Sequence, residues 1–194
     1  MIPKIIHLCW LSGEAFPESI QKCLVTWKEF LPDYEIWVWD TKRFDINSVL
    51  WTKQAYENHK YAFAADYIRL YVLYNYGGIY LDSDVIVYKS FNELLCLPYF
   101  IGQDYTRSFE VAVIGAEKRT AWIGEVLKRY QNRPFVKSDG TFDMLTLPEV
   151  FYQQLNLKYK FYKLHKFEKY ESNATKIYVF DKDFFNSRNS VQVN

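Results

Sequence analysis

Two carboxylates one residue apart are the residues of this chain most suited to chemistry. Asp82-Ser83-Asp84 follows the apolar run of residues 79–81, which is typical of a short strand. Open α/β sheets bind their ligands at the carboxyl ends of strands. Where the chain leaves the regular pleat, both carboxylates can face one side, and together they suit a hard divalent cation. A solvated turn is the simpler alternative, because Asp-Xaa-Asp is common in loops.

A second charged pair precedes this motif. Residues 60–76 predict a helix that ends at Gly77-Gly78 and is apolar nearly all round, so Asp66 and Arg69 are expected inside it. One interpretation is an internal ion pair between residues three apart. The other is that Asp66 accepts hydrogen bonds from sugar hydroxyls while Arg69 donates to a hydroxyl or phosphate oxygen.

The first predicted strand, residues 2–9, carries one further candidate directly after it. Trp10 has a flat ring that could stack on a nucleotide base, although a core tryptophan is the alternative. His7 lies within the apolar run and is expected to be a hydrogen-bonded core residue without a catalytic role.

The order of strands and helices indicates an α/β sheet with right-handed crossovers. Apolar spacing of three to four residues marks the helices, and short β-branched and aromatic runs mark the strands. We expect strands over residues 2–9, 34–40, 79–81, 99–102, 111–115 and 177–180, an extended segment over 85–88, and helices over 17–30, 60–76, 121–130 and 149–155.

Length and composition indicate one folded domain. The 194 residues are 49% hydrophobic and 20% aromatic with a net charge of +1, which excludes a disordered, collagenous or coiled-coil chain and argues against an electrostatic nucleic-acid binder. Cys9, Cys23 and Cys96 are odd in number and widely spaced, so we expect reduced thiols. Without a signal-peptide pattern or a long apolar stretch, a cytoplasmic location is expected.

Residues 158–170 alternate lysines with aromatic rings. An edge strand whose lysines prevent aggregation is the favoured interpretation. The alternative is a basic patch that meets an anionic or lipid-linked acceptor as a peripheral contact at the inner membrane face.

Three stretches resemble, in the same order, the family 32 glycosyltransferases, which include capsular polysaccharide transferases and yeast mannosyltransferases. They are IPKIIHLCWLSG, CLVTWKEFLPDYEIWVWD and FAADYIRLYVLYNYGGIYLDSDV, and the similarity covers residues 2 to about 95. The resemblance implies a single-domain GT-A fold, a Rossmann-like mixed sheet flanked by helices. Residues 1–95 would then form the nucleotide-sugar-binding half and residues 96–194 the acceptor-side half.

The resemblance also assigns roles to individual residues. It implies that Leu8 and Trp10 bind the nucleotide, with Trp10 on the uracil ring, and that Tyr80 lies near the ribose. Asp66 and Arg69 would hold the donor sugar. Asp82 and Asp84 would bind Mn²⁺ or Mg²⁺, and the catalytic set would be Asp66, Arg69, Asp82 and Asp84.

The implied reaction is metal-dependent, retaining transfer of a sugar from a UDP-sugar to a glycan or lipid-linked saccharide, in bacterial capsular or surface polysaccharide synthesis, with no nucleic-acid partner. Family members usually continue past KIYVFDKDFF into a segment that closes over the donor, whereas this sequence ends at Asn194. We therefore expect slow transfer unless Asn186 and Ser187 replace that segment. Two alternatives remain: an impaired member that binds nucleotide sugar without efficient turnover, and an interaction module whose acidic loop binds calcium.

Overall fold

The computed structural model describes residues 1–185, so Asn186 and Ser187 lie outside the described residues. Its first elements follow the predicted order of strand, helix and strand. They are β1 (Ile5–Cys9), α1 (Glu18–Phe30) and β2 (Glu35–Trp39), and β1 pairs with β2 in parallel. The first half of the chain therefore begins as the expected βαβ unit.

A single mixed sheet of seven strands runs through the molecule, in the order β2-β1-β3-β5-β4-β7-β6. β3 is parallel to β1, whereas β5 is antiparallel to both β3 and β4. The last two strands are parallel to each other and β7 is parallel to β4. The later strands are β3 (Gly78–Leu81), β4 (Tyr99–Gln103), β5 (Phe109–Ala116), β6 (Lys160–Leu164) and β7 (Lys176–Phe180).

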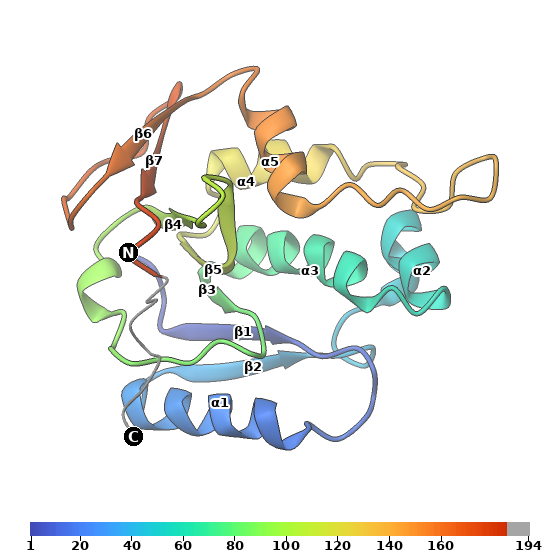
Figure 1. The fold of residues 1–194 in the computed structure, drawn as a ribbon, viewed down its shortest axis with the longest axis horizontal. Coiled ribbons are helices and arrows are strands. Elements are labelled where there is room, and N and C mark those ends of the chain that lie inside the picture. The colour runs from blue at the N-terminus through green and yellow to red at the C-terminus, as the bar shows by residue number, and fades with distance from the viewer. Residues whose placement is uncertain (186–194) are drawn as a thin grey trace.

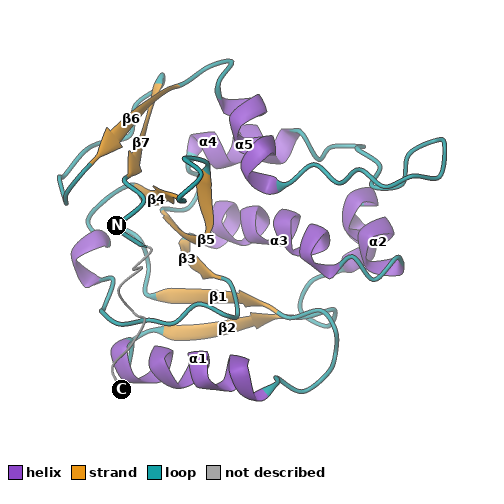
Figure 2. Ribbon diagram, in the orientation of Figure 1, coloured by secondary structure: helices purple, strands orange, loops and turns teal. Residues whose placement is uncertain are grey.

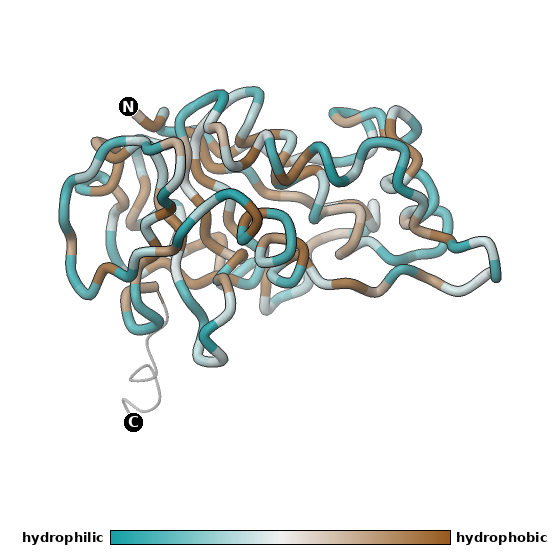
Figure 3. Tube along the Cα trace, turned by 90° about the horizontal axis from the view of Figure 1, so that it is seen from above, coloured by the Kyte–Doolittle hydropathy of each residue, from teal (hydrophilic) through white to brown (hydrophobic). Residues whose placement is uncertain are grey.

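Helices cover both faces of this sheet. Figures 1 and 2 show α1 on one side and α2 to α5 together on the other. Each side has its own buried cluster, with Trp27 of α1 in one and Trp51 of α2 in the other. In Figure 3, many of the hydrophobic segments of the chain, drawn in brown, accordingly lie in the interior of the molecule. The remaining helices are α2 (Leu50–Glu57), α3 (Tyr61–Tyr76), α4 (Ala121–Lys128) and α5 (Leu147–Leu155), with 3-10 turns η1 (Ile46–Ser48) and η2 (Asn92–Leu94).

The pair Gly77-Gly78 joins α3 to β3. It therefore links the helix that carries Asp66 and Arg69 to the strand that precedes the Asp82-Ser83-Asp84 turn. Gly77 has φ 68° and Gly78 has φ 106°, conformations that L side chains rarely adopt. A Cβ on Gly78 would lie 2.6 Å from the Ile5 carbonyl oxygen, so only glycine allows β3 to enter the sheet beside β1 here.

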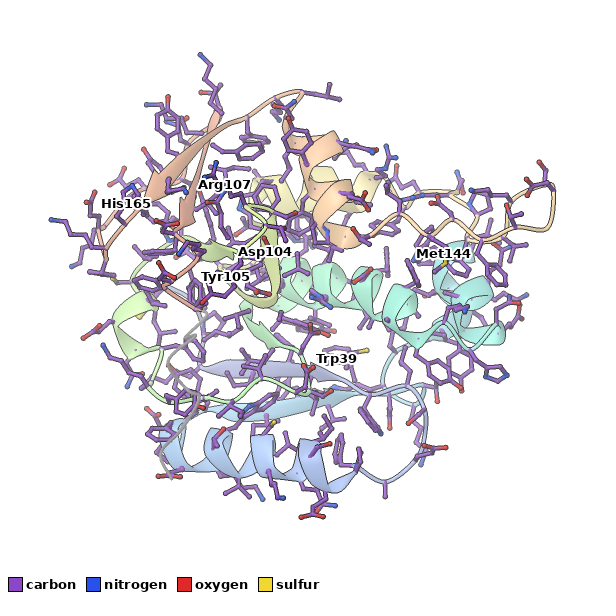
Figure 4. The ribbon with its side chains drawn as sticks, viewed as in Figure 1. Trp39, Asp104, Tyr105, Arg107, Met144 and His165 are labelled. Atoms are coloured by element: carbon purple, nitrogen blue, oxygen red, sulfur yellow. The ribbon has the colours of Figure 1, made fainter. Side chains whose placement is uncertain are left out.

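His7 is the hydrogen-bonded core residue that the sequence predicts. Its side chain is fully buried, its Nε2 lies 2.7 Å from the Gly77 carbonyl oxygen, and its Nδ1 accepts from Trp39 Nε1 at 3.0 Å. Burial lowers its pKa to about 4, which keeps the ring neutral. Figure 4 marks Trp39 near β1 and β2, towards one edge of the sheet, and His165 near β6, at the other edge.

Two segments differ from the predicted sheet and helices. Residues 85–88, expected to be extended, lie outside the sheet after the turn that follows β3, and α2 occupies a stretch for which no element was predicted. The expected edge strand is confirmed, since β6 ends the sheet and Lys163 pairs with Asp181. The three cysteines are free. Within the described residues, no helix is long and apolar enough to cross a membrane.

Candidate functional site

A cavity of about 410 Å³ opens at the carboxyl ends of β1 and β3. Six of the seven predicted site residues line it: Trp10, Asp66, Arg69, Tyr80, Asp82 and Asp84. Three separate elements supply them, namely the loop after β1, one face of α3, and the end of β3 with its following turn. Trp10 and Asp84, which are 74 positions apart in the sequence, thus line the same cavity.

The topology explains why a cavity forms here. From β1 the chain crosses through α1 to β2 on one side, and it returns through α2 and α3 to β3 on the other side of β1. The strand order therefore reverses at β1, with α1 on one face of the sheet and α3, which leads into β3, on the other. Such a switch point is where open α/β sheets bind their ligands.

The two acids of the motif lie in a tight turn, as their spacing predicts. Asp82 N–H donates to the Ala112 carbonyl at 2.9 Å, and Val85 N–H donates back to the Asp82 carbonyl at 3.1 Å. The Asp82 side chain is one-third exposed and Asp84 is exposed. Both acids line the same cavity, because the backbone has left the regular pleat at this point.

Arg69 joins the helix pair to this turn. Its Nη2 lies 3.0 Å from Oδ1 of Asp82 and 3.5 Å from Oδ1 of Asp66, and its Nη1 donates to the Val111 carbonyl. The guanidinium also lies over the Tyr80 ring, 4.3 Å from its centre. The internal ion pair considered from the sequence is therefore present, and Asp82 extends it to a triad.

Burial shifts the ionisation of several groups in the cavity. It raises the pKa of Asp66 to about 7, against the attraction of Arg69 and helped by the negative charge of Asp82. It raises the pKa of Tyr80 well above its usual value, so this hydroxyl stays protonated. Burial also raises the pKa of Cys9 to about 12, which leaves that lining thiol unreactive.

Trp10 is held at the cavity by the loop that follows it. Its Nε1 donates to the Glu14 carbonyl at 2.8 Å, and its ring centre lies 4.9 Å from that of Phe16. Leu8 differs from the other predicted residues, because its side chain is fully buried in the cluster beneath α1 and does not line the cavity. The Leu8 side chain is therefore part of the core, and a contact of Leu8 with the nucleotide stays a prediction.

Sequence reasoning assigned no site role to several further lining residues, among them Ser12, Ile20 and Tyr61. Tyr61 begins α3 and lies four residues before Ala65 and eight before Arg69, so its helix face could have been recognised. Its hydroxyl lies 3.0 Å from His59 Nδ1. Ser12 and Ile20 carried no sequence signal beyond their position next to Trp10 and at the start of α1.

The acidic turn could contribute only part of a metal-binding shell. Across residues 1–185, no group of three His, Cys, Asp or Glu side chains is placed to hold a metal ion. The Asp84 carboxylate nevertheless makes no hydrogen bond or ion pair within that range, and the bond from Arg69 involves only Oδ1 of Asp82. Two hard oxygen donors are thus available, which fits a divalent cation completed by water and ligand oxygens.

Comparison with known families identifies this part of the chain. Residues 17–101 match the sequence model of the family described as "Glycosyltransferase sugar-binding region containing DXD motif". This stretch is similar to a glycosyltransferase sugar-binding region. It includes Asp66, Arg69 and Tyr80, and its DXD acids are Asp82 and Asp84.

Two fungal proteins are similar in sequence to a larger part of the chain. Inositol phosphoceramide mannosyltransferase 3 of Schizosaccharomyces pombe is 30% identical over 150 residues, which are 75% of this chain and 41% of that protein. Mannosyl phosphorylinositol ceramide synthase SUR1 of Saccharomyces cerevisiae is 31% identical over 135 residues, 66% of this chain and 34% of that protein. The chain thus spans about two fifths or less of the length of these relatives.

A solved structure confirms the fold. The chain of the PaToxG glycosyltransferase superposes on this chain with a TM-score of 0.60, covering 80% of this chain and 69% of its own, at 23% identity. The predicted GT-A-like, Rossmann-type mixed sheet in a single domain is therefore confirmed.

Proposed function

We propose that the cavity at β1 and β3 binds a nucleotide-diphosphate sugar, and that the chain transfers this sugar to a glycan or lipid-linked acceptor. One observation carries the proposal: Trp10, Asp66, Arg69, Tyr80, Asp82 and Asp84, drawn from three elements, line one cavity at the switch point of the sheet. An accidental acidic turn would not be accompanied by an aromatic ring and a buried carboxylate in the same cavity.

Each group has a role in this proposal. Trp10 offers a ring for stacking on the base, and Asp66 offers carboxylate oxygens to sugar hydroxyls. Asp82 and Asp84 would hold Mn²⁺ or Mg²⁺, which when bound neutralises the pyrophosphate. Because Arg69 is engaged by two carboxylates and the Val111 carbonyl, its main role is to position Asp66 and Asp82.

The donor and acceptor are narrower proposals. The fungal relatives are named as mannosyltransferases or mannosyl-lipid synthases acting on inositol phosphoceramide. Those names support a hexose donor and an acceptor with a hydroxylated, lipid-linked headgroup for this chain, and we keep a lipid-linked saccharide as the proposed acceptor. We retain UDP as the proposed nucleotide, and retention of configuration and a role in bacterial capsular or surface polysaccharide synthesis as part of the same proposal.

The location is proposed on separate grounds. The three free thiols support a reducing compartment such as the cytoplasm. Lys160 and Lys176 face each other across β6 and β7, and this like-charge pair would suit an anionic surface. A peripheral contact at the inner membrane face therefore accompanies the lipid-linked acceptor as a proposal.

Calorimetry with UDP, GDP and their sugars, each with Mn²⁺ and then with excess chelator, tests the donor proposal. We expect a metal-dependent affinity for one nucleotide, and equal binding in chelator would contradict the metal bridge. Release of UDP in the presence of glycan and lipid-linked acceptors then tests transfer. Tight donor binding without nucleotide release would instead favour the impaired relative, and calcium binding without nucleotide binding would favour the interaction module.

A further inference from the structure

A second and larger hollow lies on the other side of helix α3 from the donor cavity. Its volume is about 980 Å³, at the upper end of what ligand sites commonly occupy. Its walls are α3, α4 and the segment of residues 48–50 that leads into α2. Figure 1 shows α4 and α2 near α3 and away from α1.

Three tyrosines from two neighbouring elements line this hollow. Tyr67 and Tyr74 lie on α3, one helical repeat of seven residues apart and therefore on the same face, and Tyr130 follows α4. None of their hydroxyls has a hydrogen-bond partner among the residues that the structure describes. Tyr130 is only 1% exposed, and its hydroxyl oxygen is not among the buried side-chain atoms that lack a partner, so what remains accessible of this residue includes the hydroxyl at the wall of the hollow.

A guanidinium borders the tyrosines. Arg119 lies over the Tyr74 ring, 4.8 Å from its centre, and forms no ion pair with the described part of the chain. By contrast, Lys128 on the same wall is paired with Glu125. Arg119 also adopts φ 66°, a conformation of the kind that concentrates at binding and catalytic sites.

Close packing fixes the orientation of one of these rings. A Cβ on Gly124 of α4 would lie 2.9 Å from the Tyr74 ring, so the helix approaches this ring as closely as its backbone allows. The Tyr67 and Tyr130 rings meet edge to face with centres 5.7 Å apart. The hollow therefore presents aromatic rings in fixed positions, and the hydroxyls of these rings make no hydrogen bond with the described residues.

We propose that this hollow is an oligosaccharide-binding site, distinct from the donor cavity. Sugars combine apolar C–H faces with hydroxyl edges, and such a ligand matches rings that have unpaired hydroxyls and a free guanidinium. An apolar ligand would leave the same groups without partners. In identifying the bound saccharide with the acceptor, the inference rests on the proposed function, whereas saccharide binding itself does not.

Helix α3 lies between the two sites. Asp66 and Arg69 face the donor cavity, while Tyr67 and Tyr74 face the hollow. The hollow would therefore anchor a part of the acceptor remote from the reacting hydroxyl. Binding there should need neither nucleotide nor metal.

Saturation-transfer NMR with maltotriose, mannotriose and cellotriose, recorded in excess chelator, tests this site. We expect at least one trisaccharide to bind, and the double variant Tyr74→Phe/Tyr130→Phe to weaken that binding by about tenfold or more through the lost hydroxyls. Tyr162→Phe is the matched control, because Tyr162 is 40% exposed on β6 and lies outside the hollow. Absence of binding by all three trisaccharides would overturn the proposal.

Two further measurements keep the result specific. Arg119→Asn removes the guanidinium while tolerating the positive φ, so it should weaken binding even if the tyrosine variant folds poorly. Saturating UDP with Mn²⁺ should leave the trisaccharide signal unchanged. Displacement by UDP would place the saccharide in the donor cavity and overturn the second site, whereas saccharide binding without any UDP affinity would refute only the proposed donor function.

Discussion

Arg69 donates from Nη2 to Oδ1 of Asp82 at 3.0 Å and so ties helix α3 to the turn that follows β3. The Arg69 side chain is 6% exposed and that of Asp82 is 33% exposed, so the bond joins a buried cation to an acid at the wall of the cavity. A charge-assisted bond of this kind holds the carboxylate in one orientation. The acidic turn is thus supported from within the protein before any ligand arrives.

Arg69→Ala is therefore expected to destabilise the fold strongly. Removing one member of a buried ion cluster leaves Asp66 and Asp82 without their counter-charge, a loss that commonly amounts to about 3–5 kcal/mol. The free energy of unfolding, measured by urea denaturation, checks this. Lys53→Ala, an exposed change in α2, should alter stability little. Unchanged stability of Arg69→Ala with lost donor affinity would instead make Arg69 a ligand-binding residue.

Asp66 should make stability fall as pH rises. Its folded-state pKa of about 7 exceeds the ordinary value of 3.8, so the folded state holds this proton more tightly than the unfolded state does. The contribution is complete below pH 4 and is lost progressively as pH rises towards 7. Denaturation curves at several pH values should show this slope in the wild type and a flatter profile in Asp66→Asn. A steeper fall in the variant would contradict the assignment.

The sequence predicts the first half of the fold well, for a physical reason. The strands before and after α1 are short, apolar and bounded by turns, and α3 combines a long apolar pattern with a glycine stop. Helix α2 was missed because its eight residues are less apolar and less clearly amphipathic than those of α4, a helix of the same length that was predicted. The antiparallel insertion of β5 beside β3 depends on long-range packing, which local patterns do not encode.

The candidate site was predictable residue by residue, but its internal bonding was not. Spacing placed Asp66 and Arg69 on one helix face and Asp82 at a strand end. That a single guanidinium would contact both acids follows from how α3 packs on the sheet, which spacing does not reveal. Leu8 differs from these residues, since its side chain points into the core although it lies next to the site in sequence.

Trp10→Ala should weaken nucleotide binding. If the ring stacks on the base, its loss removes about 1–3 kcal/mol of binding free energy, as base stacking on aromatic side chains does elsewhere. Calorimetric titration with UDP in Mn²⁺ measures this. Phe16→Ala is the matched control, because Phe16 packs on Trp10 but does not line the cavity. An affinity unaffected in a folded Trp10→Ala protein would make Trp10 a structural residue of its loop.

Asp84→Asn should separate metal binding from stability. Asp84 is exposed and makes no hydrogen bond or ion pair within residues 1–185, so its charge contributes little to the fold. Neutralising it also relieves repulsion from Asp82, and the melting temperature should therefore stay nearly constant or rise. Mn²⁺-dependent UDP binding should nevertheless fall, because one of two hard oxygen donors is lost.

Asp82→Asn provides the contrast that makes the Asp84 result interpretable. Asp82 accepts from Arg69, so its neutralisation should lower both the melting temperature and metal-dependent binding. Glu29→Gln, an exposed acid on α1 away from the cavity, should change neither quantity. If Asp84→Asn instead melts well below the wild type while retaining Mn²⁺-dependent UDP binding, Asp84 stabilises the turn and the cation is held by other groups.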